Sequence, residues 1–87
     1  MANHPQAKKR ARQRIRITAR NKHVRSTVRG FVKHVVTAVE AGDKDKAKAA
    51  LGEAVRQLDR AVTKGVVPRK TASRKISRLT IAVAKLA

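Results

Sequence analysis

The sequence predicts an all-α fold, an antiparallel three-helix bundle whose long first helix projects beyond the bundle at its N-terminal end. Apolar residues recur every three or four positions in three separate segments, which is the spacing of one helical face. Two glycines separate these segments, and the first joint is so short that the helices beside it must run antiparallel. The first segment carries a helix-start pattern well before its apolar stripe, which predicts the projection.

The first helix is expected over residues 4–41. The tetrapeptide Asn-His-Pro-Gln at residues 3–6 fits a capping box with proline in the first turn. A helix of this length is roughly 55 Å long, about twice the length of either later helix. Its apolar stripe consists of Val24, Val28, Phe31, Val35 and Val39. Residues 1–23 therefore form a projecting basic arm in this prediction, because they have no apolar partner of their own.

The second helix is expected over residues 44–64. Gly42 follows the last turn of the first helix, where a left-handed residue is favourable and glycine adopts that conformation readily. Asp43 then suits the N-cap, and Asp45 stands in the first turn near the positive end of the helix dipole. The apolar stripe of this helix consists of Ala47, Leu51, Ala54, Leu58 and Val62.

The third helix is expected over residues 68–86. Gly65 ends the second helix, and Pro68 is favourable in a first helical turn. Thr71 is an alternative cap, so the start of this helix has two possible positions. The apolar stripe consists of Ala72, Ile76, Leu79, Val83 and Leu86.

The composition allows one small domain with a thin core. The chain has 87 residues and a formal net charge of +18, and repulsion of that size destabilises a compact state. A single Phe is the only aromatic residue, so Val, Leu, Ile and Ala must form the core. There is no Cys, which excludes disulfides and thiolate metal sites. No apolar run is long enough for a membrane span.

The charge is unevenly distributed along the chain. Residues 1–39 contain eleven basic residues and no acid, and residues 61–87 contain seven basic residues and no acid. Residues 40–60 contain all five acids and five basic residues, so this segment is neutral. The layout predicts that both ends face a polyanion and that the middle faces mostly water.

The most basic segment, residues 7–25, contains nine Lys or Arg. Like charges four positions apart, such as Lys8/Arg12 and Arg16/Arg20, each disfavour a helix by about 0.2–0.5 kcal/mol. Arginines also alternate over residues 10–16, which is compatible with a strand, but no second strand is predicted. We expect a helix that frays in the free protein and becomes ordered against an anionic partner.

No catalytic or metal-binding constellation is evident, and no cofactor is predicted. The three histidines, His4, His23 and His34, do not have metal-ligand spacing with the acids, so we expect them to face solvent or the anionic partner. The segment Gly-Asp-Lys-Asp-Lys at residues 42–46 lacks the later ligands and the glutamate of a calcium loop, and capping explains it better. A Gly-rich phosphate loop is absent, and the sequence therefore predicts no enzyme.

Two basic stripes lie beside the apolar stripes. One is on the first helix and one on the third, and they consist of Lys22, Arg25, Arg29 and Lys33, and of Arg69, Lys70, Arg74, Lys75 and Arg78. A single Lys is usually a solvated surface charge, but eighteen basic residues in two acid-free blocks destabilise the fold without any gain in folding. The set predicts a dense polyanion as the partner.

Nucleic acid suits this pattern better than the alternatives. An anionic membrane would need an inserting apolar face, and Ile15 and Ile17 point to different sides of a helix. An Arg-rich transit peptide over the first 25 residues would leave the basic third helix unexplained. The chain lacks DNA-reading motifs and stacking aromatic residues, so we expect contacts mostly to the phosphate backbone of folded RNA. A DNA-compacting or general polyanion-binding protein is the second reading.

Seven motifs in order also resemble one known family. They are MAN at the start, AKKR at 7–10, RN at 20–21, RSTVRGFVK at 25–33, AVEAGDK at 38–44, LDRAVTKGVV at 58–67 and TASRKISRL at 71–79. Together they cover essentially the whole chain and are similar to the bacterial small-subunit ribosomal protein twenty family. The chain departs from that family at Gln6 and Pro68, where Ser and His are more usual, and in its more apolar C-terminal segment.

The resemblance implies a structural ribosomal protein in the cytoplasm, with no catalysis, no cofactor and no metal. It implies direct binding to small-subunit (16S) ribosomal RNA early in assembly, with contacts to the 5′ domain and to the long decoding-site helix of the 3′ minor domain. Few or no protein contacts, no membrane and no homo-oligomer are expected.

The family's basic motifs can be placed on this chain by position. They match Lys8, Lys9 and Arg10, then Arg25, Arg29 and Lys33, and then Arg74, Lys75 and Arg78. The resemblance and the charge layout together give seventeen candidate residues for binding ribosomal RNA. They are Lys8, Lys9, Arg10, Arg12, Arg14, Arg16, Arg20, Lys22, Arg25, Arg29, Lys33, Lys64, Arg69, Lys70, Arg74, Lys75 and Arg78.

Overall fold

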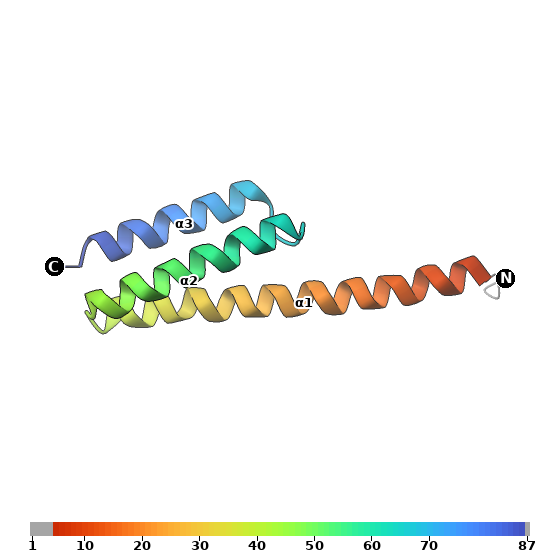
Figure 1. Ribbon diagram of the computed structural model, residues 1–87, viewed down its shortest axis with the longest axis horizontal. Helices are drawn as coiled ribbons and strands as arrows, with labels where there is room; N and C mark the ends of the chain where they lie inside the picture. The colour runs from red at the N-terminus through yellow and green to blue at the C-terminus, as the bar shows by residue number, and fades with distance from the viewer. Residues whose placement is uncertain (1–4, 87) are drawn as a thin grey trace.

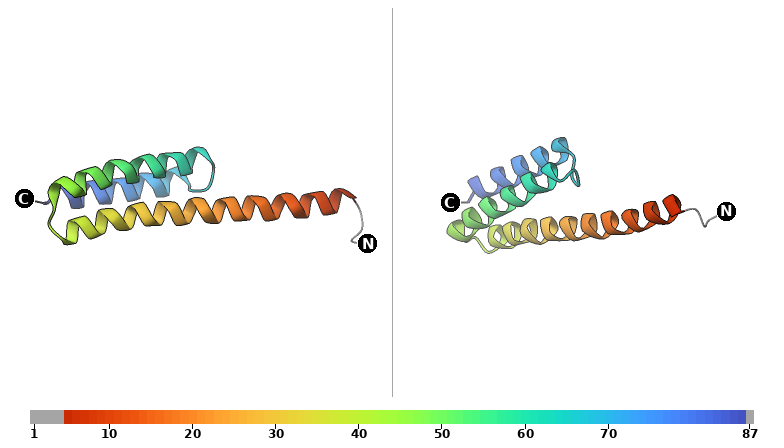
Figure 2. Two further views of the ribbon diagram at one scale, coloured as in Figure 1. Left: turned by 60° about the horizontal axis from the view of Figure 1, so that its bottom comes forward. Right: turned by 45° about the vertical axis from the view of Figure 1, so that its right-hand side comes forward.

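The computed structural model describes residues 5–86 and contains three antiparallel α-helices (Figures 1 and 2). They are α1 (Pro5–Glu40), α2 (Lys44–Thr63) and α3 (Arg69–Ala84). The molecule is elongated, with extents of 64 × 21 × 15 Å, because α1 continues far beyond the other two helices. The predicted all-α class and the long first helix are confirmed. Half of the predicted capping box, residues 3–4, lies outside the described residues.

Helix α1 is continuous over 36 residues, a length of about 54 Å. The alternating arginines at residues 10–16 lie within it, so the strand alternative is wrong. The buried side chains of α1 are Val24, Val28, Val35 and Ala38, all in its C-terminal half. Every residue from 5 to 20 is exposed, and no other helix lies beside this part of α1 (Figure 1).

Both joints use the predicted glycines. Gly42 and Gly65 have φ angles of 72° and 73°, the left-handed conformation that favours glycine. The Asp43 side chain accepts a hydrogen bond of 3.1 Å from the backbone N–H of Lys46, which confirms the predicted N-cap of α2.

The start of α3 differs from the prediction. Pro68 has an extended conformation (φ −62°, ψ 142°) and is itself the N-cap residue, so the helix begins at Arg69. No side chain caps this first turn, and the alternative cap at Thr71 is therefore wrong.

The core consists of two hydrophobic clusters along the bundle. One lies beside the α2–α3 joint and contains Val24, Val28, Leu58, Ala61, Val66 and Ala72. The other lies toward the α1–α2 joint and contains Val35, Ala38, Ala47, Ala54, Leu79 and Val83. All three predicted stripes face these clusters. Many members are alanines, whose small side chains allow the helix axes to approach closely but bury little apolar area. Within residues 5–86, no helix is long and apolar enough to cross a membrane.

Candidate nucleic-acid interface

The positive charges of the chain are available for an external partner. All 23 Lys and Arg lie within residues 5–86, and all are exposed. These residues form one salt bridge, between Arg56 and Glu53 on the exposed side of α2, with 3.0 Å between the guanidinium nitrogen and the carboxylate oxygen. None of the seventeen candidate residues is in a salt bridge there. Their charges are therefore neutralised only by solvent ions when the protein is free.

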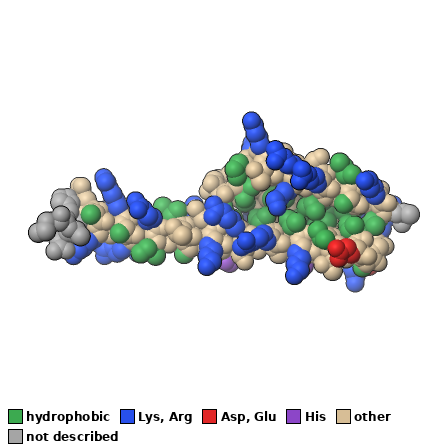
Figure 3. Space-filling view, turned by 180° about the vertical axis from the view of Figure 1, so that it is seen from behind, with side chains coloured by type: hydrophobic (Ala, Val, Ile, Leu, Met, Phe, Trp, Pro, Cys, Tyr) green, Lys and Arg blue, Asp and Glu red, His purple; other side chains and the backbone are tan. Residues whose placement is uncertain are grey.

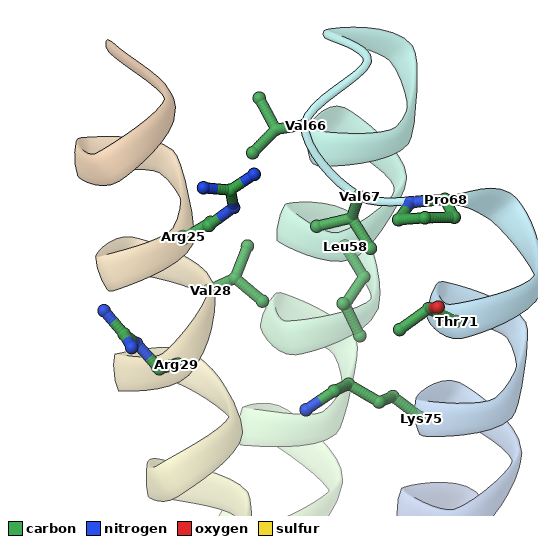
Figure 4. A pocket seen from close by; sticks show the side chains of 9 residues that line it. All are labelled: Arg25, Val28, Arg29, Leu58, Val66, Val67, Pro68, Thr71 and Lys75. Carbon is green, nitrogen blue, oxygen red and sulfur yellow. The ribbon is translucent and has the colours of Figure 1, made fainter. Parts of the chain in front are cut away.

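One group of candidates surrounds a groove between α1 and α3 (Figure 4). We call it the α1–α3 groove; it has a volume of about 320 Å³ and is lined by Arg25, Val28, Arg29, Leu58, Val66, Val67, Pro68, Thr71 and Lys75. The side chains of Arg25 and Lys75 extend toward it from opposite walls (Figure 4). On the face shown in Figure 3, Lys and Arg side chains border a patch of hydrophobic side chains and continue along the arm.

Helical spacing places other candidates on the same surface. Lys22 and Lys33 lie one turn to either side of the Arg25–Arg29 pair on α1, at intervals of three and four residues. Arg78 lies one turn beyond both Lys75 and Arg74 on α3, at intervals of three and four residues. Two helices that are distant in sequence thus form one basic surface around the groove.

Two candidates lie elsewhere. Arg69 lines a hollow between α2 and α3 that also contains Asp59 and Ser73. Lys64 is in a hollow on α2 with Arg56 and Arg60. The structure therefore does not bring these two residues to the α1–α3 groove, and Lys70 is exposed in the first turn of α3.

The remaining candidates are on the arm, within residues 5–20, all of which are exposed. Lys9, Arg12 and Arg16 line one shallow hollow together with Gln13, and Arg20 follows one turn later. Arg14 is two residues from both Arg12 and Arg16, about 200° around the helix. The arm therefore presents positive charge on more than one side.

The arm is stabilised only by its own helical hydrogen bonds. We expect amide hydrogens of residues 8–18 in the free protein to exchange near the rate of a fraying helix, because like charges repel and nothing packs on them. Amides near Val28 and Val35 should exchange mainly through unfolding of the bundle. Hydrogen exchange with peptide resolution measures both. Equal protection of the two regions would contradict the expectation.

Sequence reasoning did not identify the floor of the groove. Val66 is only 6% exposed although it lies in the joint between two helices, and Val67 and Pro68 line the groove beside it. The available signal was two consecutive valines in a joint where polar residues are usual.

Comparisons with known proteins agree with the sequence resemblance. The family model for Ribosomal protein S20 matches residues 2–84. The small ribosomal subunit protein bS20 of Syntrophotalea carbinolica is 54% identical over 79 residues, which are 91% of each chain. The protein of the same name from Paracoccus denitrificans is 51% identical over 87 residues, which are 100% of this chain and 98% of the relative. These matches extend over nearly the whole chain, and we conclude that it belongs to the ribosomal protein S20 family.

Proposed function

We propose that this chain, a non-enzymatic structural constituent of the small ribosomal subunit, binds small-subunit ribosomal RNA directly through its basic helix faces. The observation that carries the proposal is the placement of its charge. Exposed cations without carboxylate partners cover the arm and border the α1–α3 groove, while the acids are confined to the segment from Glu40 to Asp59. In this role the protein neutralises phosphates and stabilises the packing of RNA helices during assembly.

The binding energy comes mainly from phosphate contacts. Each phosphate that a Lys or Arg neutralises releases condensed counterions, so affinity falls steeply as salt rises. Arginine adds two parallel hydrogen bonds to one phosphate, which fixes orientation as well as charge. Residues 40–60, which include most of α2 and the Glu53–Arg56 pair, carry five acids and five basic residues, so this segment lacks such a surplus and faces solvent in this arrangement.

The arm and the groove surface have different roles in the proposal. The bundle supplies a rigid surface around the α1–α3 groove, and the arm reaches RNA that the bundle cannot touch. Cations on opposite sides of one exposed helix can neutralise phosphates of two neighbouring RNA helices at once. Following the family resemblance, the proposed partners are the 5′ domain and the long decoding-site helix of the 3′ minor domain. Arg69 and Lys64 flank this interface.

The test is a competition titration at near-physiological salt. The ligand is the folded 5′ domain of small-subunit ribosomal RNA, with the decoding-site helix added separately. Unrelated structured RNA and duplex DNA compete at equal phosphate concentration. We expect binding that survives excess competitor and declines steeply, but not completely, as salt is raised. Equal affinity for every polyanion would contradict direct recognition of this RNA and favour a general polyanion binder.

A further inference from the structure

The α1–α3 groove has a property that phosphate binding alone does not require. Its floor is apolar, with Val67 and Pro68 at least partly exposed and Val28, Leu58 and Val66 buried. A surface that only neutralises phosphates needs cations on a solvated helix, as the arm provides. Here the cations are at the rim of an apolar hollow (Figure 4). The combination suits a ligand with both an anionic part and a flat apolar part.

The size of the groove limits what can occupy it. Its walls extend from Arg25 to Arg29 on α1 and from Thr71 to Lys75 on α3, four residues or about 6 Å along each helix axis. Its volume of about 320 Å³ is at the small end of ligand sites, which span roughly 300–1,000 Å³. A docked protein helix needs anchors over two or more turns, so it does not fit. One nucleotide does.

We propose that the α1–α3 groove binds a single unstacked nucleotide of RNA, with its base on the apolar floor and its phosphate at the cationic rim to which Arg25 and Lys75 belong. This inference rests on the proposed function, because it assigns one site within the RNA-binding surface. The chain has no aromatic residue in this groove on which a base could stack. The Pro68 ring and the valine methyl groups supply the apolar surface instead.

The polar groups at the groove support the assignment. Arg25 and Lys75 extend toward the groove from α1 and α3 near its opposite ends, so each end of the groove offers a cation to a phosphate (Figure 4). Thr71 places a hydroxyl at the same rim, where it can donate to or accept from a ribose hydroxyl or a base edge. None of the acids lines the groove, so no carboxylate repels the anion.

Methyl NMR of the 87-residue chain tests the proposal with adenosine 5′-monophosphate. The matched abasic compound is ribose 5-phosphate, which carries the same phosphate without a base. We expect the nucleotide to shift the methyl signals of Val28, Val66 and Val67 through the ring current of the base. Ribose 5-phosphate should leave these signals in place, and Val83 in the other core cluster should respond to neither. Equal responses to the two compounds would overturn the proposal.

Two variants locate the site. Thr71→Tyr fills the groove from an exposed position and should abolish the base-dependent shifts, whereas the control Ser77→Tyr, also exposed on α3, should preserve them. Lys75→Gln should weaken nucleotide binding about threefold to tenfold, since it removes one charge-assisted hydrogen bond at a solvated rim. Unchanged shifts in Thr71→Tyr would place the nucleotide elsewhere and refute the proposal.

The experiments distinguish failure of the groove assignment from failure of the proposed function. If the base-dependent shifts are absent while the protein still prefers the ribosomal 5′ domain over competitors, only the groove assignment is wrong. If the shifts are present but all polyanions bind equally, the groove is a nucleotide site and recognition of ribosomal RNA is refuted.

Discussion

Reversing two charges on the arm, with Arg14→Glu and Arg16→Glu together, is expected to weaken binding to the ribosomal 5′ domain about a hundredfold. Each lost arginine–phosphate contact accounts for roughly 1.5 kcal/mol, or about tenfold in affinity. The two residues lie about 200° apart around α1, so the change affects both sides of the arm. The salt dependence of binding should also decrease, by about one phosphate contact for each residue.

The same substitutions should leave the bundle intact. Both residues are exposed and precede the packed part of α1, so the free energy of unfolding should change by no more than about 0.5 kcal/mol. The free arm should become more helical, because Arg12 and Arg20 would each have a glutamate four residues away instead of Arg16. Weaker binding by a more ordered arm would show that its charge, and not its disorder, determines affinity.

A matched control separates the effect of local charge on affinity from the effect of net charge. Lys44→Glu with Lys48→Glu makes the same change in net charge at exposed positions of α2 outside the proposed interface. This variant should bind within about threefold of the unchanged protein at physiological salt, where charges more than about 8 Å apart are largely screened. Fluorescence anisotropy gives the affinities and urea unfolding gives the stabilities. If the arm variant unfolds residues 24–84, the arm is part of the core and the division of the chain into an arm and a bundle is wrong.

The sequence was sufficient to predict the helices because local signals agreed with one another. Gly42 and Asp43 end one helix and start the next by conformational and capping preferences that need no tertiary context. Stripes with a period of 3.6 residues then showed which face of each helix is buried. The exception was the start of α3, where Pro68 is the N-cap and no side-chain hydrogen bond marks the boundary.

The α1–α3 groove could not be predicted from those signals. Its walls come from α1 and α3, and its floor from α2 and from the joint that contains Val66 and Val67. Helical periodicity shows that Arg25 and Lys75 each flank an apolar stripe, but it does not give the relative placement of the two helices. That placement depends on how the small side chains of Ala61 and Ala72 pack between the helices. The exposed basic residues were readable from composition, while the hollow between them required the packed structure.

Leu58→Ala is expected to unfold most of the free protein. Leu58 is 0% exposed and belongs to the cluster that joins α1, α2 and the start of α3. Truncating a fully buried leucine usually lowers the free energy of unfolding by about 2–5 kcal/mol. The packed part of the chain, residues 24–84, has an expected total of only about 3–9 kcal/mol at 0.05–0.15 kcal/mol per residue, and its net charge lowers that further. Circular dichroism in urea measures the loss.

RNA should restore the fold of this variant, because a ligand that binds only the native state stabilises it by mass action. At a free RNA concentration of one hundred times Kd, the gain is about 2.7 kcal/mol, which is close to the loss from the substitution. Ile81→Ala is the control, since Ile81 is 52% exposed and its truncation should change stability by no more than about 0.5 kcal/mol. If Leu58→Ala were as stable as the control, the cluster around Leu58 would not hold the bundle together. If it unfolded but RNA failed to restore its helical signal, binding would not require the packed surface, and the basic residues would act as a charged chain alone.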